Sequence, residues 1–405
     1  FSFYDNPASA SLFHDLPRSY VQTNKDLFDP RLGFAWSPAR ATVIRGGAGV
    51  FHNRDVFYTF NSQGTNYPLV PMTQINYGNV DNPIGGSAAT TFPVAVNQIN
   101  PNLKTPVLYQ FSLGVQRTLP GDVLLDAAFV GQRARNLYYN APLGALPYDF
   151  CYNNRATNCN VFQTYRGYSS VTQTGNQQFT DFNSLQLSAR RQYANGVFVA
   201  ANYTFSKNME RGQVRDPLNL DLDIGPSALT RTHVVNITFL YELPFWKQNR
   251  MFAARMLAGW SVSGITAFST GLPMNVTLIG NLASLAGTAT RPDLIANPNL
   301  PHGDKTFTNY FNTAAFAQPA VGTLGNAGYD TLLGPGDNNW DLAILKNFRI
   351  RESFKVQYRC EMFNAFNHPE VAYNGVNTQW GSPLFGHVTA MNASRVIQMS
   401  LKATF

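Results

Sequence analysis

FKVQYRCEM, at residues 354–362, and IQMSLKATF, at residues 397–405, alternate strictly between apolar and polar side chains. A period of two residues predicts a β-strand with one apolar face and one polar face. Both stretches are nine residues long, which is close to the roughly 9–11 residues of a tilted bilayer-spanning strand and longer than the roughly 5–6 residues of an average soluble strand. The alternation therefore favours an antiparallel transmembrane β-barrel over a soluble sheet.

The same alternation recurs along the chain. Counting such segments between Arg31 and Phe405 predicts an all-β fold with about 11 to 14 strands, part of a barrel that we expect to have about 22 strands and long external loops. Our best count is about eleven, and complete bacterial barrels have an even number of strands, so we expect the sequence to start within an external loop. The clearest further examples are residues 107–116, 197–206 and 235–241.

The connections between these segments fall into two length classes. Outer-membrane barrels have short periplasmic turns and long external loops, so the two classes predict the two sides of a membrane. The long connections are rich in Gly, Asn, Pro, Ser and Thr, as loops are. Short connections are predicted at residues 38–40, 119–122, 194–196, 243–250 and 351–352, and long ones at residues 52–106, 133–181, 207–231, 270–338 and 366–393.

The composition argues against several other classes of protein. Charged residues make up only 13% of the 405 residues and aromatic residues another 13%, which suits a fully water-exposed surface poorly. Mean hydropathy is −0.18, and no run approaches the roughly 18 apolar residues of a transmembrane helix. The net charge is +7, but the Lys and Arg residues are scattered, so we expect no nucleic-acid partner.

Five segments resemble a known family, the Oar-like TonB-dependent receptors of Gram-negative bacteria. The resemblance implies that residues 1–405 form the C-terminal portion of such a receptor's β-barrel. It also implies that the family's signal peptide, plug and TonB box are not part of this sequence. The segments are DPRLGFAWSPARATVIRGGAGVF (29–51), YQFSLGVQRTLPGDVLLDAAFVGQRARNL (109–137), THVVNITFLYELPFW (232–246), GWSVSGITAFSTGLPMNV (259–276) and RCEMFNAFNHPE (359–370).

The resemblance also implies a location and a set of partners. We expect the chain in the outer membrane of a Gram-negative bacterium, in contact with outer-membrane lipid, the barrel-assembly machinery and an unidentified solute. The TonB complex would be reached through the missing N-terminal part. Phe405 closes an alternating strand and resembles the aromatic signal by which such barrels are recognised during assembly.

The sequence lacks the motifs of catalysis and of cofactor binding. Gly46-Gly47-Ala48-Gly49 is not followed by Lys-Ser or Lys-Thr, so it does not form a P-loop. No His-Glu-x-x-His or Gly-x-Ser-x-Gly motif occurs, which leaves no zinc helix and no nucleophile elbow. We therefore predict no enzyme activity, no cofactor and no metal site. Asp221 and Asp223 place oxygen donors close together, but they complete no known calcium loop.

One predicted external loop combines aromatic side chains with Asn and Arg, a composition suited to binding glycans or peptides. Its candidate substrate-binding residues are Tyr152, Phe162, Tyr165 and Tyr168.

The same stretch contains two of the three cysteines, Cys151 and Cys159. In an oxidising compartment they either form a disulfide that closes a small loop or stay as two thiols.

Two further groups of residues have predicted positions in the barrel. One is charged and is predicted on the polar, lumen-facing strand faces, where it forms either a path for an anionic or peptide-like solute or mutual ion pairs: Arg45, Arg117, Arg190, Arg359 and Glu361. The other is aromatic and is predicted at the bilayer boundaries: Trp36, Tyr109, Trp246, Trp260, Trp340 and Tyr358.

The resemblance implies an outer-membrane receptor that imports a large nutrient, such as an oligosaccharide or a peptide, with energy delivered through TonB. The long external loops are also compatible with a structural, adhesion or protein-export barrel. A soluble all-β carbohydrate-binding module is a third possibility, but it would repeat a blade motif at a fixed period, and the sequence contains none.

Overall fold

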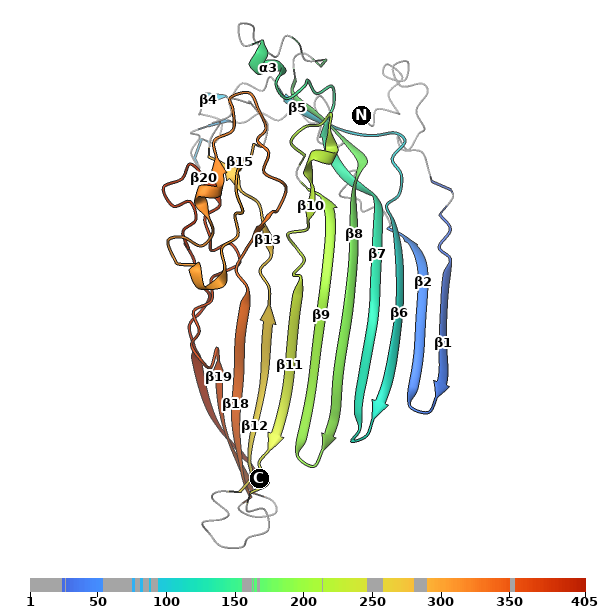
Figure 1. Cartoon of the computed structure of the whole chain (residues 1–405), viewed down its shortest axis with the longest axis vertical. Coiled ribbons are helices and arrows are strands. Elements are labelled where there is room, and N and C mark those ends of the chain that lie inside the picture. The colour runs from blue at the N-terminus through green and yellow to red at the C-terminus, as the bar shows by residue number, and fades with distance from the viewer. Residues whose placement is uncertain are drawn as a thin grey trace.

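Nearly all regular structure in the computed structural model of the chain is β-strand (Figure 1). The described residues are 24–25, 27–53, 75–76, 81–82, 87–88, 94–154, 162, 164–165, 168–212, 214–245, 258–279, 290–349 and 354–405. The helices among them have three or four residues each. None of these helices has the length and apolar character needed to cross a membrane.

One sheet of 13 strands dominates the fold, and along its main path each strand pairs with the next in an antiparallel ladder. This confirms the predicted all-β antiparallel fold. The path runs through β1 (Arg31–Ala39), β2 (Thr42–His52), β6 (Val107–Leu119), β7 (Val123–Pro142), β8 (Tyr168–Ala194), β9 (Val197–Arg211), β11 (His233–Glu242), β12 (Trp260–Ser269), β18 (Asp337–Arg349), β19 (Lys355–Phe363) and β21 (Val396–Thr404).

The sheet has two open edges, β1 and β21, so the barrel does not close within the described residues. Two short strands join the sheet off the main path, where β5 (Val94–Ile99) pairs with β8 and β10 (Ile224–Pro226) pairs with β9. The remaining elements belong to the connections: β3 (Ile75–Asn76), β4 (Ser87–Ala88), α3 (Phe150–Asn153), η2 (Leu220–Asp223), β13 (Pro273–Met274), β14 (Thr277–Leu278), β15 (Asp293–Leu294), η3 (His302–Asp304), η4 (Thr313–Ala315), β16 (Phe316–Ala317), β17 (Leu332–Leu333) and β20 (Gln379–Trp380).

Tight turns join the strands at one end of the sheet, the end where the C-terminus lies (Figure 1). Asn195 and Gly196 connect β8 to β9 with φ angles of 53° and 80°, and Gly121 and Asp122 lie between β6 and β7 with φ angles of 84° and 59°. Positive φ at both central residues suits the twist of a short hairpin, and Asn, Asp and Gly tolerate it best. The short connections predicted at residues 119–122 and 194–196 are therefore confirmed.

One short connection was predicted wrongly. The connection between β11 and β12 covers residues 243–259 rather than 243–250, because β12 begins only at Trp260. The intervening MFAARML (residues 251–257) has no period-two alternation, and residues 246–257 lie outside the described part of the chain.

The register separates an apolar face of the sheet from a polar face. On one face, Leu113, Phe129, Leu185 and Phe205 lie opposite one another across β6, β7, β8 and β9, and all four are exposed. Three residues along each strand, and therefore on the other face, lies the row Gln116, Asp126, Ser188, Asn202 and Asn236. A continuous exposed apolar band on one face and polar groups on the other are what a barrel between lipid and a water-filled lumen needs.

Most of the charges predicted for the lumen lie on the polar face, and several are paired. Arg45 Nη2 lies 2.5 Å from Asp126 Oδ2, and Arg359 Nη2 lies 2.5 Å from Glu361 Oε1. Arg190 shares this face, since it is two residues from Ser188 in β8. Of the two predicted roles for these charges, the ion pairs favour mutual neutralisation of Arg45 and Arg359 over a charged path for a solute.

Arg117 was assigned to the wrong face. It follows Val115 by two residues and pairs in register with Thr42 and Leu125, so it belongs to the apolar face. Its position close to the β6–β7 turn explains how this face tolerates it, because a long arginine side chain can extend its charged end to the membrane boundary.

The predicted boundary aromatics that the structure describes lie on the apolar face, and Trp246 lies outside the described residues. Trp340 is at the external end of β18, where its ring packs edge-on against Phe268 and Phe366, with centroid distances of 5.6 Å to each. Such amphipathic rings are favoured at membrane boundaries. The aromatic residues on this face are Trp36, Tyr109, Trp260, Trp340 and Tyr358.

We expect arginine at Leu187 to destabilise the folded barrel in phospholipid vesicles by about 2–4 kcal/mol, because Leu187 lies within the apolar band and a charge there would face lipid near its midplane. The matched control is arginine at the neighbouring Gln186, which lies on the polar face and should cost clearly less. Urea unfolding followed by the heat-modifiable migration of the barrel measures both. Equal destabilisation by the two substitutions would contradict the assignment of the faces.

Candidate functional site

Three connections fold together at the end of the sheet opposite the tight turns (Figure 1). They are the β9–β11 loop (residues 212–232), the β12–β18 loop (270–336) and the β19–β21 loop (364–395), and we call them the loop assembly. The last two share a buried apolar core that includes Val276, Phe311, Phe316, Leu332 and Val376. The long connections are thus packed structures in their own right, which can present side chains in defined positions.

Aromatic rings from both loops fill the centre of this core. Phe311 and Phe316 of the β12–β18 loop and Phe385 of the β19–β21 loop contact one another edge to face, with centroid distances of 5.1–5.9 Å. Edge-to-face contact is a favourable arrangement for aromatic pairs. Loops that are distant in sequence are held together in this way.

A buried ionic cluster links the β9–β11 loop to the β12–β18 loop. Arg215 Nε and Arg291 Nη2 each lie 2.8 Å from Asp223 Oδ1, and the backbone N–H of Arg215 donates to Asp223 Oδ2 at 2.8 Å. All three side chains are at most 5% exposed. Burying one carboxylate between two guanidinium groups requires further hydrogen bonds to offset the loss of hydration.

Backbone carbonyls of the β12–β18 loop supply those hydrogen bonds. Arg215 Nη1 donates to Leu324 O at 3.1 Å and to Gly325 O at 3.0 Å. Arg291 Nη1 donates to Ala327 O at 3.4 Å, and its guanidinium lies 5.3 Å from the centre of the Tyr329 ring. Burial, together with the neighbouring charge of Arg215, lowers the pKa of Arg291. The cluster therefore fixes the position of residues 324–330 relative to the β9–β11 loop.

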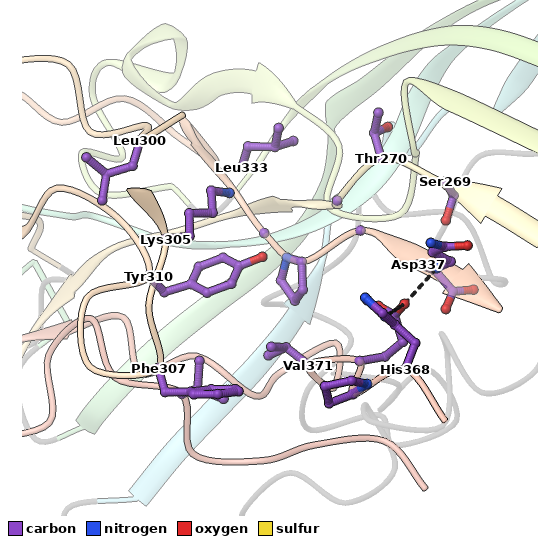
Figure 2. Close-up of a pocket in the computed structure, with 18 of the residues that line it drawn as sticks. Ser269, Thr270, Leu300, Lys305, Phe307, Tyr310, Leu333, Asp337, His368 and Val371 are labelled. Carbon is purple, nitrogen blue, oxygen red and sulfur yellow. Dashed lines mark hydrogen bonds and ion pairs between the residues drawn. The ribbon is translucent and has the colours of Figure 1, made fainter. Parts of the chain in front are cut away.

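A cavity of about 630 Å³ lies where the β12–β18 and β19–β21 loops leave the sheet, and we call it the Lys305 cavity (Figure 2). Lys305 and Tyr310 lie on one side of it, and Asp337 and His368 lie on the other. The Lys305 ammonium sits 4.5 Å from the centre of the Tyr310 ring. Burial lowers the pKa of Lys305, and burial together with Glu370 raises the pKa of Tyr310.

Glu370 organises the acidic side of the Lys305 cavity. Its Oε1 lies 2.8 Å from His368 Nδ1 and accepts a hydrogen bond from the backbone N–H of Asn338 at 3.0 Å. The bond to Asn338 connects the β19–β21 loop to the start of strand β18. The cavity thus has cationic, acidic and aromatic walls, which suits the binding of a polar solute.

A second cavity, of about 570 Å³, lies between all three loops, and we call it the Asp330 cavity. Asp330 is only 4% exposed and has a left-handed backbone conformation, with φ of 51°. Burial and the nearby charge of Glu210 raise its pKa to about 6, against the opposing effect of Arg291. Burial and Asp330 in turn raise the pKa of Tyr329 to about 12.

The four aromatic residues predicted to bind substrate lie elsewhere, and none of them lines either of these two cavities. Tyr152 packs against Leu278 and Leu324, and Phe162 contacts Phe150 edge to face at 5.2 Å. Tyr165 is exposed, and Tyr168 is the first residue of β8. Their role in substrate binding stays a prediction.

Cys151 lies in α3 and is disulfide-bonded, whereas Cys360 in β19 is a free thiol. Cys159 lies outside the described residues, so its pairing with Cys151 stays a prediction. Phe405 follows the last residue of β21 and is fully exposed, and its role as an assembly signal also stays a prediction.

Sequence reasoning missed the residues that organise the loop assembly. Asp223 was considered only as an oxygen donor next to Asp221, and its carboxylate instead binds the side chains of Arg215 and Arg291. No motif or spacing marks these residues or Asp330. Among the described residues, no group of three or more His, Cys, Asp or Glu is arranged to hold a metal ion.

We expect Asp223→Asn to loosen the loop assembly by about 3–5 kcal/mol, because it leaves two buried guanidinium groups without their counter-charge. Asp221→Asn is the matched control. Asp221 is 75% exposed and pairs with Arg211 at 2.7 Å, so its loss should cost less than about 1 kcal/mol. The rate of protease cleavage within residues 212–232 and 290–330 of the detergent-solubilised protein reports the difference. Indistinguishable cleavage of the two variants would count against the cluster as a structural link.

The raised pKa of Asp330 predicts that the loop assembly is more stable at pH 5 than at pH 7.5. The carboxyl of Asp330 keeps its proton up to about pH 6 in the folded protein, whereas its ordinary pKa is 3.8. The free energy that this bound proton contributes to folding is therefore present at low pH and is lost as the pH rises through about 6. Between these two pH values the difference corresponds to about 1.4 kcal/mol, because only the interval from pH 5 to the folded pKa contributes. Urea-dependent proteolysis of residues 290–335 at both pH values measures it, and Asp330→Asn should remove this part of the pH dependence. If Asp330→Asn leaves the pH dependence of loop stability unchanged, that dependence arises from another titratable group.

Comparisons with known proteins agree with this architecture. Among solved structures, the chain is similar to the outer membrane transporter YddB from Escherichia coli, with a TM-score of 0.50 and 11% identity over 93% of this chain and 40% of that one. It is also similar to the siderophore receptor PirA from Acinetobacter baumannii, with a TM-score of 0.48 and 11% identity over 93% of this chain and 41% of that one. The chain spans about two fifths of the length of these structures.

At 11% identity, the similarity to YddB shows the fold alone. A search of curated proteins found no match. The profile described as "Outer membrane beta barrel domain" matches residues 3–398, which is nearly the whole chain. With its open antiparallel sheet, apolar outer face and long packed loops, the chain therefore belongs to the outer membrane beta barrel domain family.

Proposed function

We propose that the chain is the C-terminal part of the barrel of an Oar-like TonB-dependent receptor, which takes up a large nutrient across the outer membrane. The observation that carries the proposal is the open antiparallel sheet, whose main path ends at β1 on one side and β21 on the other. Its fold is similar to about two fifths of YddB, an outer membrane transporter.

Open strand edges favour a larger barrel because lipid offers no hydrogen-bond partners. Every side chain of β1 and β21 is exposed, and the outer backbone N–H and C=O groups of both strands have no neighbouring strand within the described residues. Such edges are not tolerated against lipid. We infer that further strands pair with β1 and β21. A barrel of about 22 strands, of the size that encloses a plug, would provide them.

Coupling to TonB follows from the family resemblance rather than from a contact seen in this chain. In the proposal, a plug and a TonB box precede residues 1–405 in the native polypeptide, and the TonB complex acts through them. The barrel-assembly machinery recognises the terminal strand with Phe405. The solute enters through the loop assembly, whose two cavities face the external side.

A structural, adhesion or protein-export role is the second candidate, and the folded loop assembly favours it. Its aromatic core and ionic cluster give the external surface a fixed shape, which suits contact with another macromolecule as well as capture of a solute. In that case the barrel would act without uptake of a nutrient.

Peptide mass spectrometry of the purified outer membrane tests the proposal first. We expect tryptic peptides upstream of residue 1 on the same polypeptide, with the sequence of a plug domain. A native polypeptide that begins at residue 1 would overturn the proposal.

Growth on a panel of polymeric nutrients then separates uptake from the second candidate. A strain that lacks the gene should lose growth on a nutrient that a TonB-deficient strain also cannot use. Normal growth of the deletion strain on every nutrient that requires TonB, together with loss of surface attachment, would establish the second candidate instead.

A further inference from the structure

The Asp330 cavity brings together parts of all three loops in the loop assembly. Ala228 comes from the β9–β11 loop, Asn275 and Asp330 come from the β12–β18 loop, and Tyr373 and Gln379 come from the β19–β21 loop. Its position depends on the buried cluster of Arg215, Asp223 and Arg291 described above, which fixes residues 324–330. The cavity is therefore a built feature of the fold rather than a gap between independent loops.

Two hydrogen-bond acceptors in this cavity lack a donor. The Tyr329 hydroxyl interacts with the Asp330 carboxyl, but Asp330 Oδ2 and Asn275 Oδ1 are buried and have no hydrogen-bond donor within the described part of the chain. A buried acceptor that has lost water and gained no donor destabilises the folded state. The two unpaired acceptors point to a ligand that donates hydrogen bonds.

The rim of the cavity consists mainly of neutral polar groups. Tyr373 is 44% exposed, and Asn374 and Gln379 are exposed beside it. Asn377 and Thr378 lie deeper, and Asn377 Oδ1 accepts a hydrogen bond from the backbone N–H of Gln379 at 3.0 Å. Amide and hydroxyl groups can both donate and accept, and an exposed tyrosine ring offers an apolar face with a polar end.

The charges around the cavity disfavour ionic ligands. Asp330 is the only acidic residue among the described residues that line it, and Glu210 adds negative charge close by, so an anion would be repelled. The positive charge of Arg291 partly offsets the negative charge of Asp330, so the cavity attracts a cation only weakly. The described lining offers a metal ion one carboxylate and no imidazole, and metal sites in proteins usually supply more of these ligands.

We propose that the Asp330 cavity binds a neutral polyhydroxylated solute, as a segment of an oligosaccharide, whose hydroxyl groups donate hydrogen bonds to Asp330 Oδ2 and Asn275 Oδ1 and whose ring packs on Tyr373. This assigns a substrate class to the proposed uptake function and rests on it. The Lys305 cavity is not part of this site, because its lining is charged and includes the Lys305 ammonium and the ion pair of His368 and Glu370.

A binding measurement on the native polypeptide tests the assignment without requiring transport. The protein is purified from outer membranes in detergent and applied at pH 7.5 to an array of neutral glycans, with neutral peptides and the polyamine spermidine as competing probe classes. We expect saturable binding to at least one neutral glycan. Asp330→Asn should weaken it on the order of 10- to 100-fold, which is the usual loss for a hydrogen bond to a charged group.

Matched variants keep the test decisive even where Asp330→Asn disturbs folding. Tyr373→Ala alters only the exposed rim and should weaken glycan binding severalfold. Tyr193→Ala removes another exposed ring, 53% against 44%, which lies in β8 at the end of the sheet opposite the cavity, and should leave binding unchanged. Asp304→Asn is the control for Asp330→Asn, since Asp304 is an exposed acid of the same loop outside the cavity.

The inference is overturned if no neutral glycan binds, if only peptide or spermidine binds, or if Tyr373→Ala and Asp330→Asn both bind glycan as the unmodified protein does. Glycan binding that depends on Asp330 and Tyr373 in a protein whose deletion leaves all TonB-dependent growth intact would support the site while rejecting the proposed uptake function. The two failures are therefore distinguishable.

Discussion

The pairing of backbone hydrogen-bonding groups is the constraint on which this structure depends. Hydrocarbon offers no partner to an N–H or C=O group, so strands that cross a membrane must bond to neighbouring strands along their whole length. Within the described residues, the antiparallel ladder from β1 to β21 pairs each strand of its path with its neighbours, and only the outer sides of the two edge strands have no neighbouring strand. The proposed larger barrel rests on these two edges, whereas the interior of the ladder is a continuous wall of paired strands.

Beyond one end of the sheet, the three loops of the loop assembly pack into a folded unit that is stabilised differently from the strands. The strand faces rely on lipid or water to solvate their side chains, whereas the loop assembly buries its own aromatic core and its own ionic cluster. Arg215 and Arg291 bind Asp223 together with carbonyl groups of the β12–β18 loop. Such a cluster fixes geometry rather than adding much stability, and fixed geometry is what a solute cavity requires.

The two cavities of the loop assembly differ in the ligands that they suit. Lys305 and the pair formed by His368 and Glu370 give one cavity charged walls of both signs. The other contains unpaired acceptors, at Asp330 and Asn275, and a neutral amide rim.

Most strands, their two faces and most of the turns could be predicted from the sequence, because alternation of side chains and the Asn-Gly and Gly-Asp turn signals are properties of neighbouring residues. Arg117 was placed on the wrong face against its own parity, and the β11–β12 connection was ended too early. The long connection predicted at residues 133–181 was also wrong at both ends, because β7 continues to Pro142 and β8 begins at Tyr168. The cluster of Arg215, Asp223 and Arg291 and the Asp330 cavity could be found only in the folded chain. Their residues come from separate loops, and no local period links Asp223 to Arg291 or Asn275 to Tyr373. Contacts of that kind are set by how whole loops pack.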